Sequence, residues 1–180
     1  GYAKAKLRRQ IMIATTSVGP GATNMVTAAG VAHSNRLPVL LLSGDTYNNR
    51  LPDPVLQQVE HFGEPSTTVN DSFRSVSRFW DRITHPAQIL SSLPQAVATM
   101  MDPADCGPAF IGLPQDVQEI AYDYPVEFFN ETTWRIPRSR PDLQQVDEAV
   151  KILKTAKKPL IISGGGVRSS GAVEALVKFS

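Results

Sequence analysis

The sequence has little of several features that would narrow its function. Its 180 residues include one cysteine, Cys106, which excludes an intrachain disulfide and a cysteine-based zinc site. We expect Cys106 to be a small buried residue rather than a nucleophile. The 18 basic and 17 acidic residues leave a net charge of +1, which gives no electrostatic reason to expect a nucleic acid or an anionic membrane as partner. These features predict a cytoplasmic protein.

Long hydrophobic runs are also missing. No apolar stretch approaches the roughly 20 residues that span a bilayer, so no membrane segment is expected. The basic residues 1–10 are followed only by the short apolar run Ile11–Ala14, which is too brief for a signal peptide. With 42% hydrophobic residues, the chain can nevertheless bury a core. Because the sequence opens on Gly1 without a methionine, we expect it to be part of a longer protein.

A glycine-proline turn stands out near the start of the chain. Residues 11–14 predict a buried strand and residues 22–35 a helix of small side chains, with Gly19-Pro20-Gly21 between them. The order strand, turn, helix begins a parallel βαβ unit, in which ligands bind at the carboxyl ends of strands. The glycines would let a phosphate approach the helix start. However, neither known phosphate-loop spacing is present, and a turn that serves only packing is an equal alternative.

Alternation of strands and helices continues along the chain. Strands are predicted at 39–42 and 108–114, which are apolar runs beside proline and glycine, and at 78–83. A helix is predicted at 86–101, with a kink at Pro94. His85 stands just before this helix and is expected to cap it or to lie on the surface.

Residues 47–64 predict a long loop that enters a short helix at 55–61. Loops of this length in compact domains are often functional. The predicted helix would gather amide, carboxylate and imidazole groups able to bind hydroxyls, supplied by Gln57, Gln58, Glu60 and His61. An exposed polar helix face explains the same cluster equally well.

The C-terminal part predicts a fresh start. Residues 122–140 lack any period and are rich in aromatic, proline and charged side chains, as in a linker. Asp142 and Gln145 form a capping-box signal before an amphipathic helix. A strand at 160–163 then leads through Gly164-Gly165-Gly166 to a last helix at 171–179. The triple glycine could hold a diphosphate, but Ser169 replaces the third fingerprint glycine, which favours a turn made for packing.

Several motifs together resemble a known family. Residues 13–24, 28–32 and 38–45 resemble the pyrimidine-binding domain of thiamine-diphosphate enzymes of the acetolactate synthase superfamily. Residues 50–62 and 102–113 are most similar to the branch that hydrolyses trihydroxycyclohexane diones in inositol catabolism. The implied fold is α/β, a Rossmann-like parallel sheet flanked by helices, plus the first βα unit of a second α/β domain.

The resemblance also implies domain boundaries. Residues 1–121 would be a pyrimidine-binding domain without its N-terminal part, 122–141 a linker, and 142–180 the truncated start of a central domain. The family's catalytic glutamate would lie upstream, and its magnesium and diphosphate ligands far downstream. No catalytic or metal-binding residue is therefore expected within this chain, and the chain alone should be inactive.

Site residues follow from the same resemblance. Positions matching Pro20 and Asn24 lie against the aminopyrimidine of thiamine diphosphate in this family, so we expect Gly19, Pro20 and Asn24 to bind the cofactor. Gln57 matches a position facing the cofactor's thiazolium and the substrate, and His61 is a second substrate-facing candidate. Family sites form between subunits, which implies a homo-oligomer that acts on a small molecule.

The implied reaction is hydrolytic cleavage of a C–C bond in trihydroxycyclohexane-1,2-dione to give a deoxy-sugar acid, with thiamine diphosphate and Mg²⁺ as cofactors. One alternative is an acetolactate synthase-type carboligase, although Leu56-Gln57 stands where such synthases carry phenylalanine and glutamine. A second is a stand-alone nucleotide-binding or interaction module that uses residues 164–166.

Overall fold

The computed structural model describes residues 10–52, 55–59, 61–136 and 138–180. By its contacts the chain divides into two compact units, Gly1–Ile136 and Pro137–Ser180. None of the helices within the described ranges is long and apolar enough to cross a membrane.

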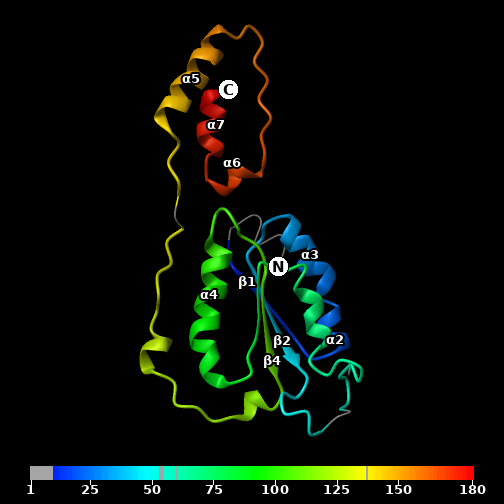
Figure 1. The fold of residues 1–180 in the computed structure, drawn as a ribbon. Coiled ribbons are helices and arrows are strands. Elements are labelled where there is room, and N and C mark those ends of the chain that lie inside the picture. Colours follow the sequence, from blue (N-terminus) through cyan, green and yellow to red (C-terminus); the bar gives the residue numbers. More distant parts are fainter. Residues whose placement is uncertain (1–9, 53–54, 60, 137) are drawn as a thin grey trace. The chain divides into compact units, whose positions relative to one another are not determined.

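The first unit is built on a four-stranded parallel sheet (Figure 1). The strands are β1 (Met12–Thr16), β2 (Val39–Asp45), β3 (Phe79–Arg82) and β4 (Ala109–Pro114), in the order β1-β2-β4-β3. In the register, Leu40 lies between Ile13 of β1 and Ala109 of β4. Because all pairs are parallel, the carboxyl ends of the strands meet at one edge. The predicted α/β fold class is confirmed.

Helices cover both faces of this sheet (Figure 1). On one face lie α2 (Pro20–Thr23) and α3 (Val26–Ser34), and on the other α4 (Ile89–Met101). The prediction of a single helix at 22–35 is wrong in one respect, because the helix is interrupted at Asn24 and Met25. The Met25 N–H donates to the carbonyl of Ala22, three residues back, which tightens and ends the first helix.

The start of α4 follows its sequence signals. A 3₁₀ turn, η2 (Pro86–Gln88), precedes it, and His85 is the N-cap of that turn. His85 Nδ1 accepts the Ala87 N–H at 3.2 Å, which confirms the capping role predicted for His85. The helix then continues through Pro94 without interruption.

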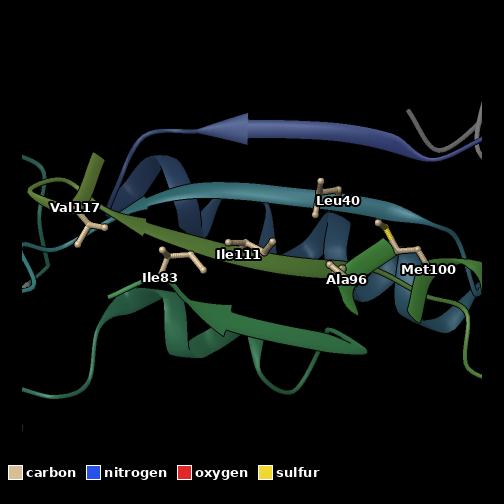
Figure 2. Close-up of a cluster of buried hydrophobic side chains, with 7 residues drawn as sticks. Leu40, Ile83, Ala96, Met100, Ile111 and Val117 are labelled. Atoms are coloured by element: carbon tan, nitrogen blue, oxygen red, sulfur yellow. The ribbon is translucent and has the colours of Figure 1, made fainter. Parts of the chain in front are cut away.

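Two clusters of buried side chains hold the layers together. Leu40, Ile83, Ala96, Met100, Ala109, Ile111 and Val117 form the cluster between the sheet and α4 (Figure 2). Ala22, Ala29, Leu41, Phe73 and Phe110 form the cluster on the opposite face, where the Phe73 and Phe110 rings stack 4.3 Å apart. Neighbours along β2 and β4 therefore point to opposite faces and are buried on both. This double burial explains why these strands are continuous apolar runs.

Short 3₁₀ turns complete the first unit: η1 (Val69–Phe73), η3 (Val117–Glu119) and η4 (Val126–Phe129). Around η4, aromatic rings contact one another in series from Tyr122 through Tyr124 to Phe128 and Phe129. The domain boundaries at residues 121 and 142 stay a prediction.

Cys106 is half-buried, and its Sγ lies 3.2 Å from the Met100 carbonyl oxygen.

The second unit contains α5 (Leu143–Thr155), α6 (Gly165–Ser169) and α7 (Val173–Phe179). Asp142 caps α5, since its Oδ1 accepts the Gln145 N–H at 3.0 Å, as the sequence predicts. The strand predicted at 160–163 is wrong, because no strand forms within 138–180 to pair with it. The last helix begins at Val173, after Gly171 with φ 71°.

Candidate functional site

The glycine-proline turn lies at the carboxyl end of β1 and packs against the long loop. Gly19 is the N-cap of α2 and has φ 67°. A Cβ added to Gly19 would overlap the carbonyl oxygen of Gln57. Both the left-handed backbone and this close approach therefore require glycine. The fold thus joins two predicted site residues, Gly19 and Gln57, that are far apart in sequence.

Pro20 and Asn24 occupy the two ends of the short helix α2. Pro20 is its first residue and Asn24 its C-cap, and both are exposed. Within the described ranges, the Asn24 side chain makes no hydrogen bond to another residue. Its amide is therefore free to donate to and accept from a ligand at this edge of the sheet.

The helix predicted at 55–61 is wrong. None of residues 55–59 and 61 is helical, and Leu56 and Gln57 form a turn. Gln57 has φ 67°, a left-handed conformation that an α-helix cannot contain. The Gln57 side chain turns towards the glycine-proline turn, where Ser17 Oγ donates to its Oε1 at 3.3 Å. Glu60, the fourth member of the predicted cluster, lies outside the described residues.

Asp116 holds the first part of the same loop. Its two carboxylate oxygens accept the N–H groups of Asn48 and Asn49 at 2.9 and 3.0 Å. Asp116 follows β4, so the loop is fastened to the edge where the strands end. Arg50, the next residue, has φ 60°.

A small cleft of about 90 Å³ opens within this loop. His61 lines it, whereas Gln57 does not. Gln58 also lines it, and the Gln58 Nε2 is buried without a hydrogen-bond acceptor among the described residues. The complete lining is Thr46, Tyr47, Arg50, Gln58, His61, Phe62, Pro65 and Thr67. The cluster expected on one helical face is thus divided, with Gln57 at the turn and His61 in the cleft.

Beneath the loop, a buried ion pair joins the ends of β2 and β3. Arg82 Nε donates to Asp45 Oδ2 at 2.7 Å, and the Asp45 carboxylate is fully buried. Asp45 Oδ1 also accepts the N–H of Thr46, the first residue of the cleft lining, at 2.8 Å. The ion pair therefore sets the position from which the loop departs.

Arg82 also contacts a second carboxylate. Its Nη2 donates to Asp71 Oδ2 at 2.8 Å and to Thr68 Oγ1 at 2.7 Å. Burial lowers the pKa of Arg82, but the Asp45 and Asp71 carboxylates outweigh this and raise it above its usual value. Burial likewise raises the pKa of Asp71, but hydrogen bonds from the Thr68 N–H, Arg74 and Arg82 outweigh it and leave that pKa below its usual value.

Sequence reasoning missed these positioning residues. Asp45 and Arg82 are the last residues of β2 and β3, and a charged residue at the carboxyl end of a parallel strand is the signal that could have found them. Asp116 carries the same signal after β4. Among the described residues, no group of three or more histidine, cysteine or acidic side chains could hold a metal ion.

Comparison with known protein families finds a matching domain at each end of the chain. The family described as thiamine pyrophosphate enzyme, N-terminal TPP binding domain, matches residues 1–63, and the thiamine pyrophosphate enzyme central domain matches residues 146–180. The chain belongs to the thiamine pyrophosphate enzymes. The resemblance drawn from residues 13–24 is thereby confirmed.

Two curated relatives are similar along nearly the whole chain. A 3D-(3,5/4)-trihydroxycyclohexane-1,2-dione hydrolase from Geobacillus thermodenitrificans is 52% identical over 179 residues, which cover 99% of this chain and 28% of the relative. The enzyme of the same name from Clostridium tetani is 51% identical over the same shares. The chain thus spans little more than a quarter of these relatives.

A solved structure supports the fold. The thiamine diphosphate-dependent 4-hydroxybenzoylformate decarboxylase of Rhodococcus jostii RHA1 superimposes with a TM-score of 0.73 at 16% identity, over 96% of this chain and 31% of that protein. At this identity the likeness establishes the α/β architecture of the thiamine pyrophosphate enzymes and no more.

Proposed function

We propose that this chain is part of a thiamine-diphosphate-dependent hydrolase that opens the ring of trihydroxycyclohexane-1,2-dione and yields a deoxy-sugar acid. The observation that carries the proposal is the 52% identity over 179 residues to an enzyme of that name. In this proposal residues 1–121 are most of the pyrimidine-binding domain, and 142–180 are the start of the central domain. The protein works in the cytoplasm as a homo-oligomer with sites between subunits.

The residues at the glycine-proline turn fit the aminopyrimidine of the cofactor. An aminopyrimidine offers ring nitrogens that accept hydrogen bonds and an amine that donates them, and the open Asn24 amide complements both. Pro20 presents an apolar ring beside it, and Gly19 closes the backbone against Gln57. When bound, thiamine diphosphate supplies the electron sink for breaking C–C bonds beside carbonyl groups. The magnesium and diphosphate ligands are assigned to other parts of the full-length protein.

On the substrate side, Gln57 and His61 have different roles in this proposal. Gln57 stands beside the turn, held by Ser17, and orients the substrate over the cofactor. His61 lies in the cleft, where its imidazole contacts substrate oxygens. Because the chain contains neither the catalytic glutamate nor the metal ligands of this family, residues 1–180 alone give no turnover.

The test uses the full-length protein that contains residues 1–180. Consumption of the dione should require thiamine diphosphate. Asn24→Ala should weaken cofactor binding about tenfold, the value of a hydrogen bond or two. Asn130→Ala, at another exposed asparagine, is the matched control and should leave binding unchanged.

Two outcomes would overturn the proposal. One is ring opening that persists without thiamine diphosphate. The other is an absence of dione consumption together with coupling of two pyruvate molecules, which would establish the carboligase alternative. The nucleotide-binding alternative has no support from the triple glycine, because α6, which begins within it at Gly165, has only five residues.

A further inference from the structure

The cleft in the long loop is lined by Phe62, Pro65 and six residues whose side chains carry hydrogen-bond donors. Arg50, Gln58 and His61 bring guanidinium, amide and imidazole N–H groups, and Thr46, Tyr47 and Thr67 bring hydroxyls. None of the described lining residues is acidic. This described lining suits an anion or a group rich in acceptor oxygens.

Arg50 is the charged arginine in this lining, and no ion pair joins its side chain to another of the described residues. The guanidinium forms no hydrogen bond or ion pair with the part of the chain that the structure describes. The Gln58 Nε2 is likewise buried without an acceptor there. An anion that enters the cleft would meet the Arg50 guanidinium and a donor, Gln58 Nε2, that has no acceptor among the described residues.

The backbone of the loop is strained at two non-glycine residues. Arg50 has φ 60° and Gln57 has φ 67°, and a non-glycine residue in this conformation costs about 1–2 kcal/mol. The anchors at Asp116 and Gly19 maintain both conformations. Strain of this kind collects at ligand sites, where the surrounding structure fixes a side chain in a required direction.

The size of the cleft limits what it can hold. Its volume of about 90 Å³ corresponds to about three water molecules at about 30 Å³ each. A carboxylate fits this space, whereas a six-carbon sugar acid does not. The cleft is therefore a subsite for one end group of a larger ligand.

We propose that this cleft binds the carboxylate of the sugar acid released by ring opening, with Arg50 as its anchor. The inference rests on the proposed function, because a neutral dione becomes a carboxylate only when the ring is hydrolysed. A guanidinium binds a carboxylate through two parallel hydrogen bonds, which a neutral carbonyl cannot match. Arg50 thereby distinguishes the product from the substrate.

The experiment measures binding to the full-length protein without cofactor, so that it does not depend on turnover. D-glucuronate serves as the carboxylate probe and D-glucose as its neutral counterpart, both titrated by calorimetry. We expect glucuronate to bind more tightly than glucose. Arg50→Gln should weaken the binding of glucuronate about tenfold or more and leave the affinity for glucose unchanged. Arg140→Gln makes the same charge change at an exposed arginine outside the cleft and should have no effect.

Three results would overturn the inference: no glucuronate binding by the wild type, equal affinity for glucose and glucuronate, or unchanged glucuronate affinity in Arg50→Gln. Inorganic phosphate is a further arm, because displacement of glucuronate by phosphate at similar concentrations would show a general anion site. If Arg50→Gln does not fold, Arg50→Lys gives the same test. Its ammonium lacks the fork, so glucuronate should bind several-fold more weakly, and equal affinity would contradict the proposal.

Failure of the proposed function is distinguishable from failure of this subsite. Arg50-dependent glucuronate binding by a protein that does not open the dione ring would leave a carboxylate site and remove the hydrolase assignment. Ring opening with no Arg50-dependent binding would do the reverse.

Discussion

The two units of this chain use similar sequence patterns with different outcomes. Residues 39–42 and 160–163 are both short apolar runs beside proline and glycine. The first forms the beginning of β2, which is paired on both sides, whereas the second forms no strand. Leu41 is 2% exposed, while Leu160 is 84% exposed.

The difference separates local from non-local structure. A helix forms its hydrogen bonds within itself, so α5 begins at its capped Asp142 although none of its residues is buried. A strand must find hydrogen-bond partners in another segment. Residues 10–136 supply four such segments, and residues 138–180 supply none.

The largest test of this comparison removes a buried side chain of the first unit. Ile111 lies on β4 and is 0% exposed. Ile111→Ala should lower the free energy of unfolding by about 2–5 kcal/mol, because it deletes methyl groups from a packed core and leaves a cavity. Urea unfolding followed by tryptophan fluorescence measures the loss, since Trp80 and Trp134 both belong to the first unit. A change under 1 kcal/mol would contradict the core described here.

The charged network beneath the loop gives a smaller, pH-dependent effect. The pKa of Asp71 is below its usual value in the folded protein. The ionised Asp71 carboxylate therefore stabilises the folded state above about pH 4, and this stabilisation is lost as the pH falls through the folded pKa. Asp71→Asn should lower the free energy of unfolding at pH 7 by about 1–3 kcal/mol and flatten its decline in acid. Urea titrations from pH 2 to pH 7, about the span of this transition, provide the measurement. Glu174→Gln, at an exposed carboxylate of the second unit, should leave the acid slope as it is.

In the second unit, helix capping should matter more than packing. Asp142→Ala removes the acceptor for the Gln145 N–H and should destabilise the start of α5 by about 1 kcal/mol. Amide exchange at residues 143–146 would become faster. Lys151→Ala, an exposed position within the same helix, serves as the control and should not accelerate exchange there. Equal exchange in Asp142→Ala and wild type would mean that α5 depends on contacts rather than on its cap.

The smallest effect is expected at Ile162, which is 88% exposed. Ile162→Ala should change the free energy of unfolding by less than about 0.5 kcal/mol. It should leave the far-ultraviolet circular dichroism spectrum unchanged. It is the matched partner of Ile111→Ala, because the same atoms are removed from a segment, residues 138–180, in which no described residue is buried. A loss comparable to that of Ile111→Ala would show that residues 160–163 are packed in solution and would remove the contrast between the units.

Much of the first unit was predictable from sequence because its signals are local. The apolar runs at 39–42 and 108–114 and the cap at His85 each correspond to an element of the structure. The break between α2 and α3 was not predictable, because it depends on one bond from Met25 to Ala22 that competes with a continuous helix. The false helix at 55–61 has a similar cause, since contacts of Gln57 with Gly19 and Ser17 fix a left-handed turn.

The sequence by itself determined the α/β class, the family and the glycine-proline turn, because apolar periodicity and a φ that requires glycine are properties of short segments. Only the tertiary structure decided which polar groups meet. It placed Gln57 against Gly19, put Arg50, Gln58 and His61 around one cleft, and paired Asp45 with Arg82 beneath it. These contacts join residues from different strands and loops. Their spacing along the chain holds no information about their distance in space until the parallel sheet brings the strand ends to one edge.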